Sequence, residues 1–399
     1  MLPDSCSSPP SGPSLGLYIH WPWCQSICPY CDFNRYPATS VDQDMWVRAY
    51  CSILESYRSE IGPRSIQSVY FGGGTPSLMA PASVATLLEA IERIWTLPAD
   101  TEITIEANPT SSESENFSGY AAAGVNRISL GIQSLRDTDL IALGRRHTVH
   151  EALAALDLAQ RHVDNVSIDL IFGRPHQTTA AWHAELSEAL LHGSRHLSLY
   201  QLTIEPGTGF GTLHRNGQLP GLPDEDRSAD MQLLTWELCR QAGYQAYEVS
   251  SFARNGHYGR HNLLYWRYDD FLGIGPGSHS RLTLDDRRYA IETRRHPHGF
   301  LRATATRGEA CRTELSPSTQ AGEYLMNALR LDEGACLDRF HALGGDPPSP
   351  ALIDEFVHAG WLTTHPSRLQ TTLQGRLRLN PILLALLQSG PDETPRPQS

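Results

Sequence analysis

Lysine is absent from this sequence of 399 residues, so arginine supplies all 32 basic side chains. Enzymes that form a Schiff base, anchor pyridoxal phosphate or use a P-loop need a lysine amine as nucleophile or phosphate contact. The absence of lysine therefore excludes these classes.

Positive charge is also scarce overall, because 44 acidic residues outnumber the basic ones and give a formal net charge of -12. A general nucleic-acid binder or a binder of anionic membranes carries an excess of positive charge instead. We therefore expect no nucleic-acid partner.

Long uninterrupted hydrophobic segments are missing as well. The uncharged runs 5–31 and 65–88 are long enough to cross a bilayer, but proline, serine, glutamine and a triple glycine interrupt them. The first basic residue is Arg35, so the amino terminus lacks the positive and apolar regions of a secretory signal. We expect a cytoplasmic protein without intrinsic membrane insertion.

Residues 1–14 and 389–399 are rich in serine, proline and glycine, and we expect flexible tails there. Between the tails, short runs of β-branched and aromatic residues alternate with amphipathic helical patterns. The runs predict parallel strands at 17–20, 69–71, 103–107, 128–132, 166–172, 197–202 and 247–249. The helical patterns cover 84–95, 152–162, 180–192 and 229–242. Repeated strand–helix units of this kind predict an α/β fold, either a barrel or an open doubly wound sheet.

The strand–helix rhythm stops near residue 280, where an arginine-rich stretch, 281–312, begins. It leads to helical patterns at 319–331, 336–343 and 352–359, followed by short strand patterns at 361–364, 368–371 and 377–379. This order is typical of a winged helix. We expect a first domain over 15–280 and a smaller α+β domain, similar to a winged helix, over 281–388.

Three of the eight cysteines, Cys24, Cys28 and Cys31, follow the first predicted strand with the spacing C-x3-C-x2-C. Structural zinc sites use four ligands, and no fourth cysteine follows nearby. A cubane iron–sulfur cluster held by three thiolates keeps one iron open for a small molecule. The spacing therefore favours such a cluster, with three buried cysteines or a zinc site completed by His20 as the alternatives.

The cysteine spacing, with an aromatic residue before the last cysteine, resembles the radical S-adenosylmethionine (radical SAM) superfamily. This resemblance implies a partial parallel (βα) barrel, a 4Fe-4S cluster and bound S-adenosylmethionine, which the reduced cluster splits into methionine and a 5'-deoxyadenosyl radical. It also implies that the glycine loop after the second strand, 72–76, holds the methionine amine through backbone groups. Glycine permits such a close backbone approach.

Polar residues at further strand ends agree with this resemblance. Carboxylates can accept hydrogen bonds from ribose hydroxyls, and glutamine or arginine can fix a carboxylate or an adenine edge. Taken singly, such residues are as readily helix-face charges or strand-end caps. The resemblance implies that S-adenosylmethionine contacts Tyr18, Gly73, Gly74, Thr75, Glu106, Gln133, Arg145 and Asp169.

Within the superfamily, the chain is similar to the coproporphyrinogen dehydrogenase branch, and 281–388 resembles that branch's carboxyl-terminal domain. The oxygen-independent coproporphyrinogen III dehydrogenases carry another cysteine two positions after the third cluster ligand, where this chain has Phe33. HemW-type haem chaperones instead have Cys-Pro-Tyr-Cys-Asp-Phe, which matches residues 28–33, and His-Asn-x-x-Tyr-Trp, which matches residues 261–266.

The second motif has a chemical basis for haem binding, because imidazole is a common axial haem ligand and aromatic rings offer flat apolar faces. The resemblance implies haem b at His261, Asn262, Tyr265 and Trp266, with His261 as the axial ligand. The alternative is a surface histidine ahead of an ordinary aromatic core strand.

The resemblance to HemW-type proteins implies a chaperone that delivers haem to respiratory proteins, and it leaves open whether S-adenosylmethionine is cleaved in turnover. One alternative is a coproporphyrinogen III dehydrogenase, which forms vinyl groups by radical oxidative decarboxylation. Another is a zinc-stabilised winged-helix scaffold with Arg368, Arg376 and Arg378 beside a nucleic-acid-binding wing. The sequence does not determine the haem recipient or the oligomeric state.

Overall fold

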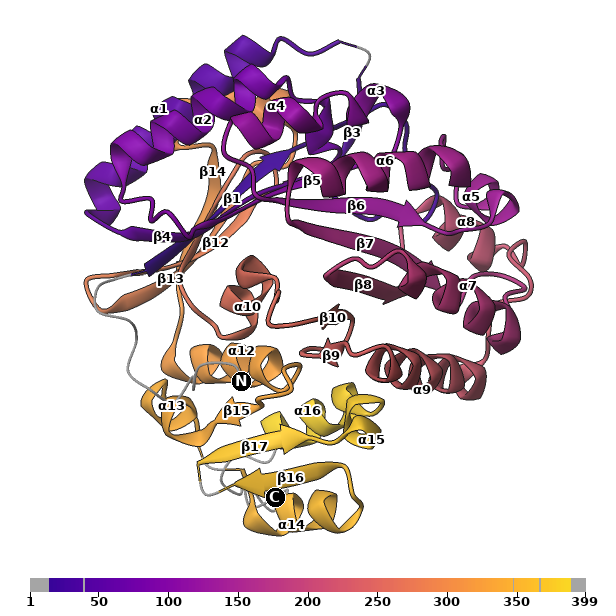
Figure 1. The fold of residues 1–399 in the computed structure, drawn as a ribbon. Helices are drawn as coiled ribbons and strands as arrows, with labels where there is room; N and C mark the ends of the chain where they lie inside the picture. The colour runs from indigo at the N-terminus through magenta and orange to yellow at the C-terminus, as the bar shows by residue number, and fades with distance from the viewer. Residues whose placement is uncertain (1–13, 39, 347, 366, 389–399) are drawn as a thin grey trace.

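The computed structural model describes residues 14–38, 40–346, 348–365 and 367–388. Its main feature is a 12-stranded sheet with the order β14-β13-β12-β11-β1-β4-β5-β6-β7-β8-β10-β9 (Figure 1). From β11 to β8 in this order, each strand is parallel to the next one. They are β11 (Phe271–Ile274), β1 (Ser14–Trp21), β4 (Ser65–Gly73), β5 (Glu102–Ala107), β6 (Arg127–Gln133), β7 (Asn165–Phe172) and β8 (His196–Gln201).

This arrangement confirms the predicted α/β class with a large, mostly parallel sheet. The first six predicted strands all lie in parallel strands of the structure. Across the described ranges no ladder joins the two edge strands, β14 and β9, so the curved sheet is open rather than a closed barrel.

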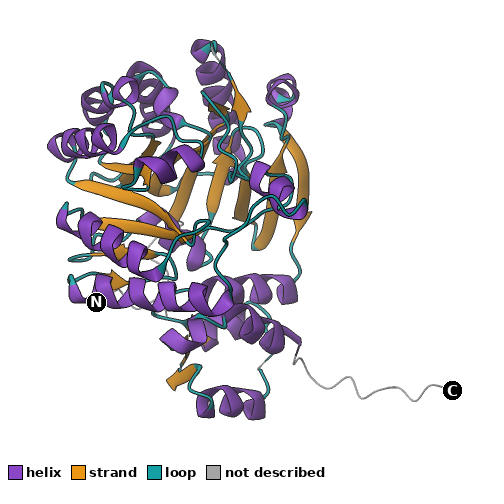
Figure 2. Cartoon of the chain, turned by 90° about the vertical axis from the view of Figure 1, so that its right-hand side faces the viewer, coloured by secondary structure: helices purple, strands orange, loops and turns teal. Residues whose placement is uncertain are grey.

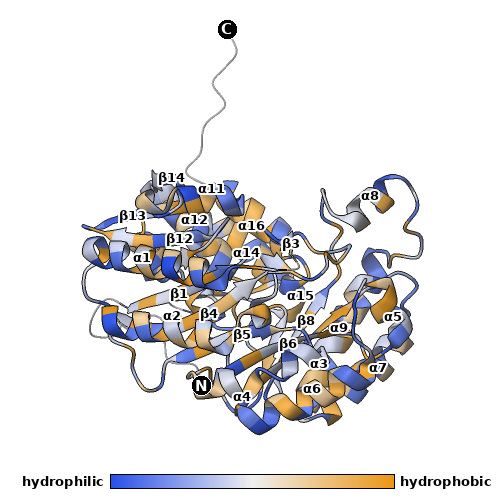
Figure 3. Ribbon diagram, turned by 90° about the horizontal axis from the view of Figure 1, so that it is seen from above, coloured by the Kyte–Doolittle hydropathy of each residue, from blue (hydrophilic) through white to orange (hydrophobic). Residues whose placement is uncertain are grey.

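Helices between successive strands cover one face of the sheet (Figures 1 and 2). They are α1 (Gln43–Ile61), α2 (Pro81–Ile94), α4 (Phe117–Ala122), α6 (Val149–His162), α7 (Thr179–Leu191) and α9 (Glu225–Gln241). Thr148 starts α6 with a capping box that includes Glu151. Hydrophilic and hydrophobic residues alternate along these helices, as Figure 3 shows, and their apolar side chains pack in one core with the strands.

The predicted strand at 247–249 is wrong. The chain bends there, between β9 (Gln245–Ala246) and β10 (Ser251–Ala253), and β10 pairs antiparallel with β8. The buried carboxylate of Glu248 accepts hydrogen bonds from the Ser250 backbone N–H at 3.1 Å and from the Ser250 hydroxyl at 2.9 Å. This local side-chain contact competes with strand pairing and produces the bend.

The stretch after residue 279 extends the large sheet instead of leaving it. Strands β12 (His279–Leu284), β13 (Arg287–Thr293) and β14 (Glu309–Glu314) join β11 as antiparallel neighbours. Asp285 and Asp286 both have positive φ, 48° and 61°, as a two-residue hairpin turn of type I′ requires. The expected start of the second domain at residue 281 therefore falls inside β12, and we propose a boundary near Leu315.

The chain after Leu315 forms a smaller unit below the sheet in Figure 1. Its three strands are antiparallel in the order β15-β17-β16. Its elements are α12 (Pro317–Ala328), β15 (Ala335–Cys336), α13 (Leu337–Ala342), α14 (Pro350–His358), β16 (Leu362–His365), β17 (Arg368–Thr371), α15 (Leu373–Arg376) and α16 (Leu379–Gln388). The predicted strand at 377–379 is wrong, because the Thr372 side chain caps α15 through the Gly375 N–H at 3.0 Å and the chain continues into α16.

The short helix α10 (Arg260–Trp266) lies between the large sheet and α12 (Figure 1). The remaining elements are β2 (Trp23–Cys24), β3 (Tyr36–Pro37), η1 (Pro76–Leu78), α3 (Ser111–Ser114), α5 (Asp137–Ala142), α8 (Gly209–Arg215), α11 (Pro297–Arg302) and η2 (Thr304–Thr306). Within the described ranges, each helix is too short or too polar to span a bilayer.

Candidate functional site

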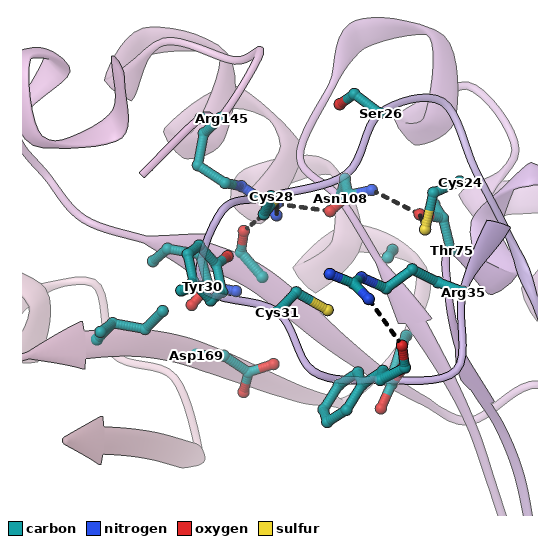
Figure 4. Close-up of a pocket in the computed structure, with 18 of the residues that line it drawn as sticks. Cys24, Ser26, Cys28, Tyr30, Cys31, Arg35, Thr75, Asn108, Arg145 and Asp169 are labelled. Carbon is teal, nitrogen blue, oxygen red and sulfur yellow. Dashed lines mark hydrogen bonds between the residues drawn. The ribbon is translucent and has the colours of Figure 1, made fainter. Parts of the chain in front are cut away.

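A cavity of about 360 Å³ opens at the carboxyl ends of the parallel strands, where ligand sites of such sheets are expected. Figure 4 shows residues that line it, with the cysteine loop on one side and strand-end residues on the other. The structure brings together the three cysteines and all predicted S-adenosylmethionine contacts except Tyr18, namely Gly73, Gly74, Thr75, Glu106, Gln133, Arg145 and Asp169.

The cysteine loop runs from β2 to β3, which pair in parallel and close its base. Within the loop, the Cys31 N–H donates to the Cys28 carbonyl at 3.2 Å. Asn34 ties the loop to the sheet, because its amide donates to the Pro276 carbonyl at 2.8 Å. These contacts keep all three cysteines at the cavity.

His20, the alternative fourth zinc ligand, does not face the cysteines. Its ring nitrogens contact the Tyr18 hydroxyl at 3.0 Å and the Asn34 carbonyl at 2.8 Å. Burial lowers the pKa of His20 to about 4, so it is a neutral, hydrogen-bonded core residue.

The thiols lie where deprotonation needs a compensating positive charge. Burial raises the pKa of Cys24 to about 11 and raises that of Cys31. The Thr75 hydroxyl donates to Cys24 Sγ at 3.4 Å, and Arg145 Nη1 donates to Cys28 Sγ at 3.6 Å. Iron held by these cysteines would supply the missing positive charge, since a coordinating thiol loses its proton.

In the part of the chain that is described, no three histidine, cysteine or acidic side chains converge closely enough to hold a single metal ion. A cubane instead takes each thiolate at a different corner, so its ligands need not meet at one point.

The glycine loop at the end of β4 approaches the cysteine loop closely. Gly73 has a φ of 117°, and a Cβ atom added at Gly74 would lie 2.8 Å from the Trp23 carbonyl oxygen. Only glycine fits this approach without displacing backbone atoms. The Gly73 N–H donates to Glu106 Oε2 at 3.1 Å, so the loop and the end of β5 form one wall.

Glu106 and Asp169 are two carboxyl groups on neighbouring walls of the cavity. Burial raises the pKa of Glu106 to about 7, and the charge of Asp169 adds to the increase, while the Tyr70 hydroxyl at 2.8 Å opposes it. Asp169 accepts hydrogen bonds from Ser129 at 2.9 Å and from Ser167 at 3.0 Å, and burial raises its pKa too. Both groups retain acceptor capacity for hydroxyl or ammonium groups.

Arg145 is the buried cation of the site. Its Nη2 donates to Asn108 Oδ1 at 2.5 Å and to the Gly131 carbonyl at 2.9 Å. Its Nε is buried and makes no hydrogen bond to any described residue. This donor is therefore free for an acceptor such as a ligand carboxylate, and Arg145 differs from Arg174 and Arg288, whose Nε atoms are also unpartnered, in that it lines the cavity.

These groups fit the two implied cofactors. The cavity has the size of a small-molecule site, and three thiols, two carboxyls, a guanidinium and a glycine loop surround it. This donor set suits a three-thiolate iron–sulfur cluster and a nucleoside that carries an amino acid.

Sequence reasoning missed several lining residues. Asn108 accepts from Arg145 and donates to Thr75 Oγ1 at 3.3 Å, and its place two residues after Glu106 at a strand end could have identified it. Phe33, which replaces the further cysteine of the dehydrogenases, lines the cavity with 57 % of its surface exposed. Other missed lining residues are Tyr30, Arg35, Tyr70, Ser129 and Tyr200.

Tyr18 lies beside the site but does not line the cavity. Its ring stacks on Tyr70, with centroids 6.1 Å apart, and on His261, with centroids 6.3 Å apart. Its position is behind the cavity wall that Tyr70 forms.

The predicted haem residues also lie outside the cavity lining, on α10. His261 is only 2 % exposed, and its ring nitrogens contact Ser68 Oγ at 2.8 Å and the Tyr265 hydroxyl at 2.6 Å. Burial lowers its pKa to about 3. Trp266 packs under the guanidinium of Arg330, 4.6 Å from the ring centroid.

Asn262 lies on α10 between these residues and is half-buried. His261 is thus neither at the surface nor ahead of a strand, as the alternative interpretation required.

Comparisons with known proteins agree along nearly the whole chain. The radical SAM superfamily profile matches residues 18–186, and the HemN C-terminal domain profile matches residues 315–378. The haem chaperone HemW of Escherichia coli is 39% identical over 93% of this chain and 97% of its own. The mitochondrial radical S-adenosyl methionine domain-containing protein 1 of Bos taurus is 37% identical over 96% of this chain and 89% of its own.

The fold is also known from a solved structure. Coproporphyrinogen III oxidase (HemN) from Escherichia coli, a radical SAM enzyme, superimposes with a TM-score of 0.78 at 20% identity, over 96% of this chain and 92% of its own. At this identity the likeness concerns the fold. Together with the chaperone relatives, it shows that the chain belongs to the radical SAM superfamily, in the HemN-like branch that includes the HemW haem chaperones.

Proposed function

We propose that this protein is a haem chaperone that binds haem b, a 4Fe-4S cluster and S-adenosylmethionine, and delivers haem to respiratory proteins from the cytoplasm. The observation that carries the proposal is the similarity to HemW chaperones over nearly the full length of both chains. Phe33 supports the same choice, because it stands where the dehydrogenases of the branch have a cysteine.

In this proposal, Cys24, Cys28 and Cys31 hold three irons of the cluster and keep the fourth open. When bound and reduced, the cluster would supply the electron that cleavage of S-adenosylmethionine requires. The cavity residues bind and orient that molecule: the Gly73–Gly74 backbone lies nearest the cysteine loop, and the unpartnered Nε of Arg145 offers a donor for a carboxylate.

The two carboxyl groups of the cavity complete the proposed nucleotide site. Glu106 and Asp169 accept hydrogen bonds from ribose hydroxyls or from the methionine amine. Gln133, at the end of β6, contributes an amide to the same cavity.

For haem, His261 remains our proposed axial ligand, with Asn262, Tyr265 and Trp266 beside it. Because both ring nitrogens of His261 are hydrogen-bonded in a buried site, iron ligation would require one of these hydrogen bonds to break and the ring to become accessible. Haem binding by this motif would therefore involve a local conformational change around His261 and not a rigid surface site.

The proposal is tested on full-length protein reconstituted with iron and sulfide without oxygen. We expect about four iron and four sulfide per chain, by the cubane stoichiometry, and saturable haem binding in an optical titration with and without the cluster. Tight zinc without iron contradicts the cluster and favours the scaffold interpretation.

A separate assay distinguishes the chaperone from a coproporphyrinogen III dehydrogenase. The reconstituted protein receives coproporphyrinogen III, S-adenosylmethionine and a reductant without oxygen. We expect no protoporphyrinogen at enzymatic rates, and its formation at such rates overturns the chaperone proposal.

A further inference from the structure

The end of β6 has an irregular backbone at Gln133, where the strand reaches the cavity. The register between β6 and β7 shifts between Leu130 and Gln133, and Gln133 has a φ of 69°. A non-glycine residue in this left-handed region persists only where its surroundings hold it, and such residues cluster at ligand sites. The contacts around Gln133 therefore show what keeps its side chain at the cavity.

A single buried carboxylate, that of Glu185 on α7, holds the turn that follows Gln133. Glu185 is 1 % exposed and accepts hydrogen bonds from the Ser134 hydroxyl at 2.6 Å and the Leu135 backbone N–H at 2.8 Å. It also forms an ion pair with Arg174 and accepts from the Gln177 amide at 3.3 Å. All these donors converge on one side chain only while the turn keeps this shape.

Arg174 extends the same network to the neighbouring elements. Its Nη1 donates to the Ile171 carbonyl at the end of β7 at 3.0 Å and contacts the Gln133 carbonyl at 3.4 Å. Its Nη2 pairs with Asp139 on α5 at 2.9 Å. Arg145 lies in the loop after α5. The Arg174 guanidinium therefore contacts both the end of β6, which carries Gln133, and the helix that precedes Arg145.

The ion pair itself lies outside the cavity, because neither Arg174 nor Glu185 is among the lining residues. A buried ion pair is weak support for overall stability, since desolvation of both charges offsets much of their attraction. The contacts of this ion pair have a clearer effect on where the neighbouring elements lie, because they fix the ends of β6 and β7 and the start of α5 relative to one another.

We propose that Glu185 and Arg174 are positioning residues for S-adenosylmethionine: they hold the 133–136 turn and α5 so that Gln133 and Arg145 face the nucleotide. This inference rests on the proposed function, in which that cavity binds S-adenosylmethionine. It assigns a role to two residues that touch neither cofactor.

The test compares Glu185→Gln, Asp139→Asn and Ser134→Ala with the control Asp157→Asn. Asp157 lies on α6, in an ion pair with Arg161, and the two side chains are 62% and 68% exposed. The dissociation constant of S-adenosylmethionine is measured by calorimetry on full-length, cluster-loaded protein, and circular dichroism and iron content report folding and cluster occupancy.

We expect Glu185→Gln to weaken S-adenosylmethionine binding by about 10-fold or more, as loss of a supporting contact commonly does at a ligand site. Asp139→Asn and Ser134→Ala each weaken it by about 3-fold, and Asp157→Asn leaves it unchanged. Iron content and haem affinity stay at the wild-type level. At saturating S-adenosylmethionine, the EPR spectrum of the reduced cluster in Glu185→Gln differs from that of the wild type, which a purely structural role does not produce.

Unchanged affinity in a folded, cluster-loaded Glu185→Gln protein overturns the inference. If Glu185→Gln does not fold, unchanged affinity in both Asp139→Asn and Ser134→Ala overturns it instead. Wild-type protein that binds no S-adenosylmethionine overturns the proposed function together with this inference, so the two failures are distinguishable.

Discussion

The cavity and α10 are adjacent regions in which the sequence places motif residues, but the two regions differ in how these residues are hydrogen-bonded. In the cavity, polar atoms face open volume, and the buried Arg145 Nε has no partner among the described residues. On α10, both ring nitrogens of His261 are hydrogen-bonded within the protein. The cavity thus leaves polar groups free for ligands, whereas the imidazole of His261 is already satisfied within the protein. The Trp266 indole N–H is the exception on α10, since it is buried without a partner among the described residues.

One side chain connects the two regions. The Tyr70 ring stacks on His261, with centroids 4.9 Å apart, and its hydroxyl donates to Glu106 at 2.8 Å. A sequence motif alone therefore does not distinguish a binding site that is open to ligands from a helix whose motif residues are buried and hydrogen-bonded within the protein.

The largest expected effect is at the cluster ligands. Cys28→Ser removes one of three thiolates, and we expect the iron content after anaerobic reconstitution to fall from about four per chain to less than about one. Iron and sulfide analysis measures this. Cys311→Ser, which changes an exposed thiol on β14, is the control and keeps full iron content. Wild-type iron content in Cys28→Ser contradicts the assigned ligand set.

A smaller but still large effect is expected at the centre of α10. His261→Ala leaves a cavity and removes the partners of Ser68 and Tyr265, so it lowers the free energy of unfolding by about 3 kcal/mol. Urea denaturation measures this change. We also expect weaker haem binding in an optical titration, with cluster content unchanged.

The control for this variant is His298→Ala on α11, whose side chain is exposed, and we expect a change within about 0.5 kcal/mol. Full wild-type stability of His261→Ala contradicts the closed state of α10. An unchanged haem titration places the haem ligand elsewhere.

Glu106 makes the free energy of unfolding depend on pH. Its pKa of about 7 in the folded protein lies above the ordinary value of 4.5, so between these values the folded protein keeps a proton that the unfolded chain has lost. The contribution of Glu106 to stability therefore falls as pH rises from about 4.5 to 7, by up to about 3 kcal/mol. Buried histidines with lowered pKa values, such as His20 and His261, contribute in the opposite direction. Urea denaturation of cluster-free wild type and Glu106→Gln at several pH values isolates the Glu106 contribution as the difference between the two slopes.

Other groups that face Glu106 are unchanged in this comparison. They are Tyr18, Tyr70, Arg127, Asp169, Tyr200 and Tyr265. Glu292→Gln, at an exposed position on β13, serves as the control and keeps the wild-type slope. Equal slopes for wild type and Glu106→Gln rule out a contribution of Glu106 to the pH dependence.

The smallest effect is expected where α10 meets the smaller unit. Arg267, directly after α10, donates through Nε and Nη2 to Glu333 at 2.9 and 2.8 Å, and these side chains are 19% and 11% exposed. A double-mutant cycle with Arg267→Gln and Glu333→Gln measures their coupling, which we expect at about 1 kcal/mol. The exposed pair Arg287 and Glu314 is the reference and gives about 0.3 kcal/mol. Equal coupling in both pairs contradicts a specific link between α10 and the smaller unit.

Much of the cavity could be predicted from the sequence, because its residues follow from short-range rules. Parallel strands bring their carboxyl ends to one edge, so Gly73, Glu106 and Asp169 meet once the strands are identified. The spacing of Cys24, Cys28 and Cys31 fixes them within one loop. Tyr18 does not line the cavity, because its ring packs against Tyr70, which does. Its place in the strand does not reveal this, since Asp169 is also the fifth residue of an eight-residue strand and lines the cavity.

The hairpin at Asp285–Asp286 and the bend at Glu248 could not be predicted in this way. Both depend on local polar contacts that hydrophobic periodicity does not report, and they moved the expected strand and domain limits. Aspartate at both turn positions is compatible with positive φ and could have suggested the hairpin.

The cysteine loop, the positions of the parallel strands along the chain and the polar residues in them could be identified from the sequence alone, because they are set by spacing along the chain. Only the tertiary structure decided that His261 is buried against Ser68, 193 residues away, and that Glu185 reaches the turn after Gln133, 51 residues before it. Burial and hydrogen bonding depend on which distant segments pack together, and no local pattern encodes that choice for a single side chain.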